Sequence, residues 1–286
     1  MAQSPEELKN RLENINAIQP LLEALRTISL SNWRFSLKKL EFAKKYLKNL
    51  FEIYNELASN HHVSKEEKPK AGNQNQMILA VGSNRGLCGN FNRDIAENLK
   101  QLITGNSEKY QIIVVGDRLR KIIERRNIPF DRYFPFPNAA DLTPDYARAI
   151  ANQISPSGNI NEILLLFNAY RGAGKYQTLQ SPIFPNEFLK FSTKGKSLEG
   201  FIFDTPEEEI FSFLNEDLHY LSIYYAFLLS AAAEHSNRFQ LMENASTNAD
   251  HLSDELFLEV QALRRQKITE EMQELAVGAG LLNKQG

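Results

Sequence analysis

Two long stretches of this chain contain neither glycine nor proline, and this feature constrains the fold more than any other. The first runs from Leu21 to Lys68 and the second from Glu207 to Val277, whereas residues 69–206 are rich in both. Because glycine and proline end or interrupt helices, their absence permits long unbroken helices in both halves of the chain. At about 1.5 Å per residue, the second stretch would extend about 105 Å as one helix.

Apolar residues in both stretches recur at the spacing of a coiled-coil seam. In the second stretch, steps of three and four connect Leu214, Leu218, Leu221, Tyr225, Leu228, Ala232, His235, Phe239 and Met242, and then Ala245, Ala249, Leu252, Leu256, Val260 and Leu263. In the first, the pattern comprises Leu8, Leu12, Ile15, Ile18, Leu22 and Leu25, and then Leu40, Leu47, Leu50, Tyr54 and Leu57. Ser4-Pro5 and Thr205-Pro206 each begin a capping box, and Pro20 is expected to kink or locally unwind the first helix.

The charges of the two arms are complementary. Residues 1–70 hold 12 basic and 9 acidic side chains, a net charge of +3, whereas residues 207–286 hold 5 and 14, a net charge of −9. We therefore predict that residues 1–68 and 205–286 form a long antiparallel two-helix coiled coil, a shaft.

The middle of the chain, residues 69–204, alternates strand and helix patterns. Apolar strand runs at Met77–Val81, Gln111–Val115 and Ile163–Phe167 are separated by helical patterns at about 90–103, 118–126 and after Thr143-Pro144. Such alternation predicts a small Rossmann-like α/β domain with a mostly parallel sheet.

The best candidate for chemistry is the glycine-rich turn at residues 82–89, between a strand and a helix, where phosphates often bind. It lacks the Gly-Lys-Ser/Thr ending of a P-loop, and its glycines do not fit the dinucleotide spacing, so a structural turn is favoured over a nucleotide site. Cys88, the only cysteine, is predicted to be a buried small residue. The histidines lack metal-ligand spacing, and His235 lies on the seam, where a polar residue can set register. No catalytic residues, metal or cofactor are predicted.

The overall composition excludes several classes of protein. The 33 basic and 35 acidic residues nearly balance, which disfavours nucleic acid as a partner, and no apolar run is long enough to span a bilayer. A run of bases from Arg34 to Lys48 is either a solvated helix face or a surface for a partner rich in carboxylates.

Two segments resemble a known family. Ser83-Asn84-Arg85-Gly86-Leu87-Cys88-Gly89 is similar to the Ser-Asp-Arg-Gly-Leu-Cys-Gly segment of ATP synthase gamma subunits. The stretch from Glu234 to Leu256 is similar to their C-terminal signature at Glu234, His235, Arg238, Met242, Asn244, Ala245, Asn248, Ala249, Leu252 and Leu256, and Arg264, Ile268, Thr269, Glu271 and Glu274 fit the final segment.

This resemblance implies a non-catalytic central stalk at the cytoplasmic face of the cell membrane. In that family the paired helices stand inside the hexamer of alpha and beta subunits, and the α/β domain lies against epsilon and the membrane rotor ring. The residues expected to contact the hexamer are Leu25, Arg26, Arg34, Lys38, Lys39, Arg238, Arg264, Arg265, Thr269 and Glu271. Those expected to act as structural motifs are Arg85, Gly86, Leu87, Cys88, Gly89, Glu234, His235 and Asn248.

The sequence also departs from the family. Ala17, Ile18, Pro20, Leu21 and Leu22 occupy the usual Asn-Thr-x-Lys-Ile-Thr positions, and Arg265 replaces a glutamine. The segment from Leu21 to Arg34 is closer to the alternate, often sodium-linked bacterial branch. Two alternatives stay open: a gamma-like scaffold that does not rotate, and an α/β nucleotide-binding enzyme with a helical dimerisation arm.

Overall fold

The computed structural model describes residues 5–60, 75–105, 110–154, 160–183 and 204–278. The elements in chain order are α1 (Pro5–Asn60), β1 (Asn75–Val81), α2 (Phe91–Ile103), β2 (Tyr110–Val115), α3 (Asp117–Arg125), β3 (Arg132–Phe134), α4 (Pro144–Ile154), β4 (Ile160–Gly172), β5 (Lys175–Pro182) and α5 (Glu207–Gly278). The chain divides into two compact units, residues 29–238 and residues 1–28 with 239–286. Within the described residues, no helix is long and apolar enough to cross a membrane.

The larger unit, residues 29–238, is built around a five-stranded sheet with the order β3-β2-β1-β4-β5. The first four strands are parallel, and β5 pairs antiparallel with β4. The predicted alternation of strands and helices is confirmed by strands β1, β2 and β4 and helices α2, α3 and α4. The sequence prediction missed β3 and β5. The turn before β5 has positive φ at Gly172 and Gly174, a signal for a tight hairpin that the sequence carries.

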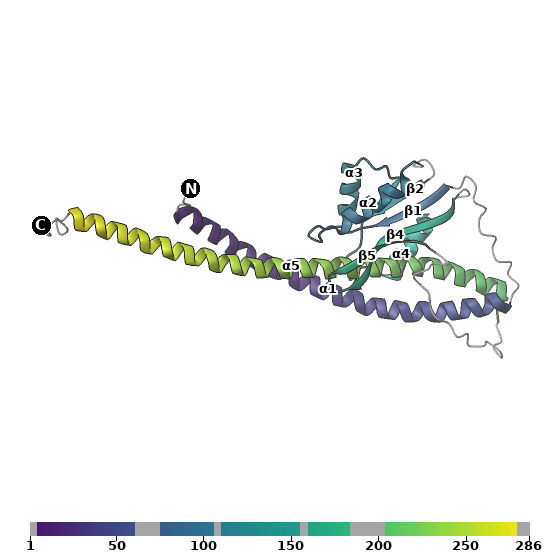
Figure 1. Cartoon of the computed structure of the whole chain (residues 1–286). Coiled ribbons are helices and arrows are strands. Elements are labelled where there is room, and N and C mark those ends of the chain that lie inside the picture. Colours follow the sequence, from purple (N-terminus) through teal and green to yellow (C-terminus); the bar gives the residue numbers. More distant parts are fainter. Residues whose placement is uncertain (1–4, 61–74, 106–109, 155–159, 184–203, 279–286) are drawn as a thin grey trace. The chain divides into compact units, whose positions relative to one another are not determined.

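Helices cover both faces of this sheet (Figure 1). In β1, Met77, Leu79 and Val81 face one side and Ile78 and Ala80 the other, because side chains alternate along a strand. The first side forms a core with α1, α4 and α5, and the second forms a core with α2 and α3. The larger unit therefore has three layers, and a long stretch of α5 is part of its core.

Small residues let α5 lie against the sheet domain. Ala231, Ala232 and Ala233 are fully buried, and Ser222 and Ser236 are buried with their hydroxyls bonded to carbonyl oxygens of the same helix. Short side chains reduce the distance at which a helix backbone can pack, and the internal bonds satisfy the buried hydroxyls. This stretch of α5 is therefore buried on nearly every side.

The smaller unit is a two-helix antiparallel coiled coil, which confirms the predicted shaft geometry there. Asn16 accepts a bond from Ser253 at 3.0 Å, Gln19 donates to Asp250 at 2.5 Å, and Arg26 pairs with Glu243 at 3.0 Å. As the residue number rises along α1, the number of the α5 residue that it contacts falls, so the two helices run in opposite directions. Leu8, Leu256 and Val260 form the buried apolar cluster of this unit.

Three sequence expectations differ from the structure. Helix α1 is continuous through Pro20, so the predicted local unwinding is wrong. Pro20 removes only one main-chain hydrogen bond, and it lies on an exposed face where the freed carbonyl can meet solvent. Ile18 and Leu252, both assigned to the seam, are 50% and 38% exposed. The seam of this two-helix coil therefore buries only some of the apolar residues that the sequence places at seam positions.

The predicted domain boundaries and the observed units are not the same. The proposed 69–204 domain would exclude residues 29–60 and 207–238, which belong to the larger unit because their apolar side chains complete its core. The capping box at Ser4 and the pair His61-His62 lie outside the described residues.

Candidate functional site: the junction between the glycine-rich loop and α5

The glycine-rich loop, residues 82–89, leaves the carboxyl end of β1 and leads into α2. A side chain at Gly82 would place its Cβ 2.4 Å from Cβ of Leu119, which no real Cβ contact tolerates. Gly116, after β2, has φ +107 and would place a Cβ 2.8 Å from the carbonyl of Gly82. The two loops therefore approach each other closely only because both positions are glycine.

Hydrogen bonds inside the domain occupy the amides of this loop. The Ser83 amide donates to Oδ1 of Asn92 at 2.9 Å, and Nδ2 of Asn92 donates to Oγ of Ser83 at 2.8 Å. The Gly82 amide donates to the carbonyl of Val115, and the Phe91 amide to that of Cys88. A phosphate site needs free amides at the helix N-terminus, and these three main-chain amides are already bonded.

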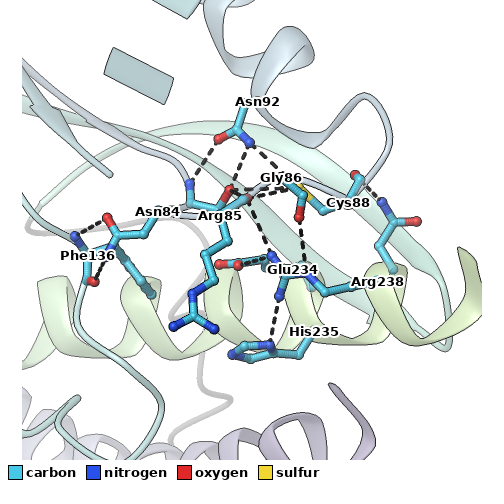
Figure 2. Close-up of polar contacts among 12 residues, drawn as sticks. Asn84, Arg85, Gly86, Cys88, Asn92, Phe136, Glu234, His235 and Arg238 are labelled. Atoms are coloured by element: carbon cyan, nitrogen blue, oxygen red, sulfur yellow. Dashed lines mark hydrogen bonds and ion pairs between the residues drawn. The ribbon is translucent and has the colours of Figure 1, made fainter. Parts of the chain in front are cut away.

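Asn84 joins this loop to two others. Its Oδ1 accepts bonds from the amides of Asp117 at 3.0 Å and Phe136 at 2.9 Å, and its Nδ2 donates to the carbonyl of Phe136. Figure 2 shows the paired contacts between Asn84 and Phe136. A carboxylate at position 84 could not donate the last bond, so the amide suits this site.

The carbonyl oxygens of the loop bind polar side chains of α5 (Figure 2). Nε of Arg238 donates to the carbonyl of Gly86 at 3.2 Å, and Nη2 donates to that of Arg85 at 3.4 Å. Nη2 also donates to Oε1 of Glu234 at 2.6 Å. Asn237 donates to the carbonyl of Cys88 at 2.6 Å. We call residues 83–89 together with Glu234, Asn237 and Arg238 the loop–α5 junction.

Burial makes the ion pair of this junction different from a surface pair. The side chains of Arg238 and Glu234 are 8% and 7% exposed. Breaking a buried pair leaves an uncompensated charge, whereas an intact pair with further hydrogen bonds is tolerated. The guanidinium of Arg238 has such bonds to two carbonyls, so the pair and the loop depend on each other.

His235 extends the polar contacts of the junction. Its Nδ1 lies 3.2 Å from Nη1 of Arg238, which can only donate, so Nδ1 is the acceptor and the ring is neutral. Burial lowers the pKa of the His235 imidazole, the Glu234 carboxylate opposes this, and the cations Arg238 and Arg85 add smaller decreases. His235 therefore contacts a charged partner in its own helix.

Cys88 lies buried beneath the junction, 2% exposed, as predicted for a small interior residue. Its Sγ is 3.7 Å from Oγ of Ser83 and 3.6 Å from Nδ2 of Asn92. Burial raises the pKa of the Cys88 thiol, and the Glu234 carboxylate adds to the rise. A thiol in this setting is a packing residue rather than a nucleophile.

The other residues predicted to contact partners are distributed along the helices. In the larger unit Arg34 and Lys38 are exposed, but Nζ of Lys39 donates to the carbonyls of Ala139, Ala140 and Leu142 at 3.0, 3.1 and 2.7 Å. Burial lowers the pKa of the Lys39 ammonium. In the smaller unit Leu25 and Arg26 are partly exposed, and Arg264, Arg265, Thr269 and Glu271 are exposed. Asn248, which was predicted as a structural-motif residue, is exposed as well.

The sequence did not indicate Asn84, Asn92 and Asn237 as residues that hold the loop. Their role depends on contacts between segments up to 149 residues apart, and an asparagine alone carries no signal of that kind. The two segments that carry the family resemblance, residues 83–89 and the start of the stretch from Glu234, do lie in contact. The structure thus explains why these two motifs occur in the same chain.

The contacts of the glycine-rich loop also matter for the alternative hypothesis of an α/β nucleotide-binding enzyme. In an open sheet of order 3-2-1-4, ligands bind beyond the carboxyl ends of the strands where the connections reverse, beside β1 and β4. Here the loop after β1 presents carbonyl oxygens to α5 instead of amides to a ligand. Among the residues that the structure describes, no group of three histidine, cysteine or carboxylate side chains could hold a metal ion.

Comparisons with known proteins agree with this geometry. Residues 4–282 match the family described as ATP synthase. The ATP synthase gamma chain of Fusobacterium nucleatum is 27% identical over 288 residues, covering 96% of this chain and 98% of that protein. The mitochondrial ATP synthase F(1) complex subunit gamma of Rattus norvegicus is 25% identical over 284 residues, covering 97% and 98%.

Solved structures share the fold. A chain of the Euglena gracilis mitochondrial ATP synthase, in a structure of its OSCP, F1 and c-ring, superposes with a TM-score of 0.66 at 14% identity, covering 99% of this chain and 96% of that one. A chain of the Tetrahymena thermophila mitochondrial ATP synthase central stalk and c-ring gives a TM-score of 0.60 at 21% identity, covering 79% and 99%. The chain therefore belongs to the ATP synthase family, in which its relatives are the gamma chains.

Proposed function

We propose that this chain is the central-stalk subunit of a rotary ATP synthase. It transmits torque between an ion-driven membrane ring and a catalytic hexamer of alpha and beta subunits, and makes and breaks no bonds itself. The observation that carries this proposal is α5, a single helix of 72 residues whose first part is built into an α/β domain. Its later part presents exposed faces to a partner.

Torque transmission requires a stiff connection between the domain and the helix. Two buried clusters and the loop–α5 junction connect α5 to the sheet domain along residues 218–238. Closely packed interiors transmit strain, whereas a flexible linker would absorb it. A twist applied to the α/β domain is therefore passed to α5 through packed side chains.

The hexamer contacts are proposed for side chains that are at least partly exposed in the structure. They are Leu25, Arg26, Arg34, Lys38, Arg264, Arg265, Thr269 and Glu271. Exposed charge pairs are weak and rearrange easily, because water and salt screen them. Such contacts suit a surface that must slide past three successive partners without stalling.

Lys39 and Arg238 act differently in this proposal. Both were expected to contact the hexamer, but their cationic groups are bonded to carbonyl oxygens or a carboxylate of the same chain. We propose that they influence the hexamer indirectly, by holding α1 and α5 in place on the domain.

The other partners follow from the same proposal. The α/β domain would contact the epsilon subunit and the membrane ring, on the cytoplasmic face of the cell membrane. The resemblance of the segment from Leu21 to Arg34 to the sodium-linked branch makes sodium the coupling ion to test first, by the sodium dependence of ATP-driven ion uptake into vesicles.

The decisive experiment is co-expression with the alpha and beta subunits encoded beside this chain, followed by native mass spectrometry and an ATPase assay. One copy bound to three alpha and three beta chains, with ATPase activity above that of the hexamer alone, is the expected result. A stable chain that never joins the hexamer would instead support a non-rotating scaffold. Tight binding of a nucleotide to the isolated chain would support an enzyme.

A further inference from the structure

The ammonium group of Lys39 in α1 is bound by main-chain carbonyls of another segment. Its Nζ donates to the carbonyls of Ala139, Ala140 and Leu142 at 3.0, 3.1 and 2.7 Å. These three residues belong to the connection between β3 and α4, residues 135–143, which we call the bridging loop. Because an ammonium group has three protons and three carbonyls accept them, its donors are used inside this chain.

The first part of the bridging loop contacts the glycine-rich loop and α5. The amide of Phe136 donates to Oδ1 of Asn84 at 2.9 Å, and the carbonyl of Phe136 accepts a bond from Nδ2 of Asn84 (Figure 2). The ring centre of Phe136 lies 5.7 Å from that of Phe227 in α5. Phe136, Ala139 and Leu142 are 5%, 5% and 0% exposed, so both ends of the bridging loop are buried.

A continuous series of polar contacts therefore connects the two long helices within the larger unit. It starts at Lys39 in α1, crosses the bridging loop and passes through Asn84 into the glycine-rich loop. It ends in α5, where the side chains of Asn237 and Arg238 donate to carbonyls of the glycine-rich loop. We call this series of contacts the polar relay.

We propose that Lys39 and Asn84 are positioning residues for torque transfer, and that the polar relay makes α1 turn together with α5 and the α/β domain. The inference rests on the proposed function, in which both helices follow the rotation of that domain. Apolar burial is non-directional, so it gives little resistance to a small rotation of α1 about its own axis. Hydrogen bonds weaken steeply when their angle changes, so the three bonds of Lys39 resist the same movement.

Asn84 is a position where this chain departs from the similar segment of ATP synthase gamma subunits, which has aspartate there. A carboxylate would keep the two bonds accepted from the amides of Asp117 and Phe136. It could not donate to the carbonyl of Phe136, and it would place a negative charge next to that oxygen. The donated bond of the polar relay therefore depends on the amide of this chain.

A simpler explanation is that each contact stabilises only its own loop. Substitutions at independent sites have additive effects on stability, whereas substitutions within one connected network do not. Cys88 distinguishes the two cases, because it is the only cysteine, is 2% exposed and lies in the glycine-rich loop, at the other end of the polar relay from Lys39. Its reaction with a thiol reagent requires the loop to open, so the rate measures how firmly the loop is held.

The first experiment measures this rate in the full-length isolated chain. Lys39→Met keeps the apolar stem and removes the ammonium group. We expect it to speed the reaction of Cys88 about tenfold in the wild-type background, and less than about twofold with Asn84→Ala, in which the polar relay is already broken. Asn84→Asp, which keeps both accepted bonds, is a milder second background and should give an intermediate increase.

The matched control is Lys44→Met, at an exposed lysine of the same helix. It should change the Cys88 rate less than about twofold in each background. Increases of equal size for Lys39→Met in every background, or no increase in the wild-type background, would overturn the polar relay.

A second experiment tests the role in torque transfer. In vesicles that contain the co-expressed complex, the ratio of ions taken up to ATP hydrolysed measures how well rotation is coupled. We expect Lys39→Met to lower this ratio at least about threefold, because α1 no longer follows the domain, and Lys44→Met to leave it unchanged. A mere loss of folded complex would reduce uptake and hydrolysis together and leave the ratio the same.

The outcomes separate this inference from the proposed function. An unchanged ratio in Lys39→Met, beside a wild-type complex that pumps ions, would overturn the role of the polar relay and leave the proposed function intact. A wild-type complex that neither assembles nor pumps ions would overturn the proposed function and the role in torque transfer. The Cys88 rates of the isolated chain would still decide whether the polar relay exists.

Discussion

The two parts of α5 differ in how much of their surface is buried, although they belong to one helix. Along residues 218–238, in the larger unit, most side chains are buried, whereas along residues 248–278, in the smaller unit, only Leu256 and Val260 are. The first part is one layer of a domain core, and the second contributes a single seam to a two-helix coil. A helix can thus be anchored by one part while the other keeps its faces available to a partner.

Ion pairs show the same contrast. Arg238 and Glu234 pair in the larger unit with side chains 8% and 7% exposed, whereas Arg26 and Glu243 pair in the smaller unit at 41% and 40%. The first pair depends on the fold around it, and the second is screened by water. If burial governs stability, substitutions in the larger unit should reduce the free energy of unfolding far more than matched substitutions in the smaller unit.

The largest effect is expected from two phenylalanines of α5. Phe227 is fully buried, with its ring centre 5.7 Å from that of Phe136, and Phe257 is 51% exposed. Phe227→Ala should reduce the free energy of unfolding by about 3–5 kcal/mol, because it leaves a cavity in a packed core. Phe257→Ala should change it by less than about 0.5 kcal/mol. Urea unfolding of both variants measures the difference, and similar losses would refute the comparison.

A second pair of variants compares the two arginines. Arg238→Met should cost about 3–5 kcal/mol, because it leaves the Glu234 carboxylate buried without its partner. Arg26→Met should cost about 0–1 kcal/mol. The loss of the junction should also speed the reaction of Cys88 with a thiol reagent, and an unchanged rate would show that the loop does not depend on Arg238.

A proline in the smaller unit tests its coiled coil separately. Leu252→Pro removes a main-chain hydrogen bond inside α5 and should cost about 3 kcal/mol or more, whereas Leu252→Ala should cost less than about 1 kcal/mol because the side chain is partly exposed. Hydrogen exchange should show faster opening of residues near 252, with residues 218–238 unchanged. Full rotation-coupled activity in the proline variant would mean that this unit is not the shaft.

The smallest effect is a pH dependence at the junction. Because the folded pKa of His235 is lowered, the unfolded chain binds the proton more readily, and stability falls as pH decreases below the unfolded value of about 6.5. The loss can reach at most about 1.4 kcal/mol per pH unit from this one group. His235→Gln should reduce the loss between pH 7 and 5, with His251→Gln, at an exposed position of the same helix, as the control. Equal slopes for wild type and His235→Gln would exclude this residue as the source.

Much of the fold could be predicted from local patterns. The long helices followed from the absence of glycine and proline with apolar residues at helical spacing, and strands β1, β2 and β4 from short apolar runs between turns. Strands β3 and β5 were missed because β3 has three residues and β5 is half exposed, so neither forms a continuous apolar run. Pro20 showed the opposite error, since an exposed proline in a long helix costs one bond without ending the helix.

The candidate site was predictable in part. Two motifs, residues 83–89 and the stretch from Glu234, were visible in the sequence. The sequence did not show that the first motif supplies carbonyl acceptors and the second supplies the side-chain donors. Arg238 and Lys39 looked like partner-binding cations because a sequence shows a charge without showing what faces it.

The sequence by itself determined the elements: helical periodicity, strand runs, turn glycines and the opposite charges of the two arms all depend on residues near one another in the chain. The tertiary structure alone decided which of these residues face inward. Burial of Arg238, bonding of the Gly82 and Ser83 amides and exposure of Phe42 on α1 depend on contacts between distant segments, because the folded chain decides what lies against each polar or apolar group.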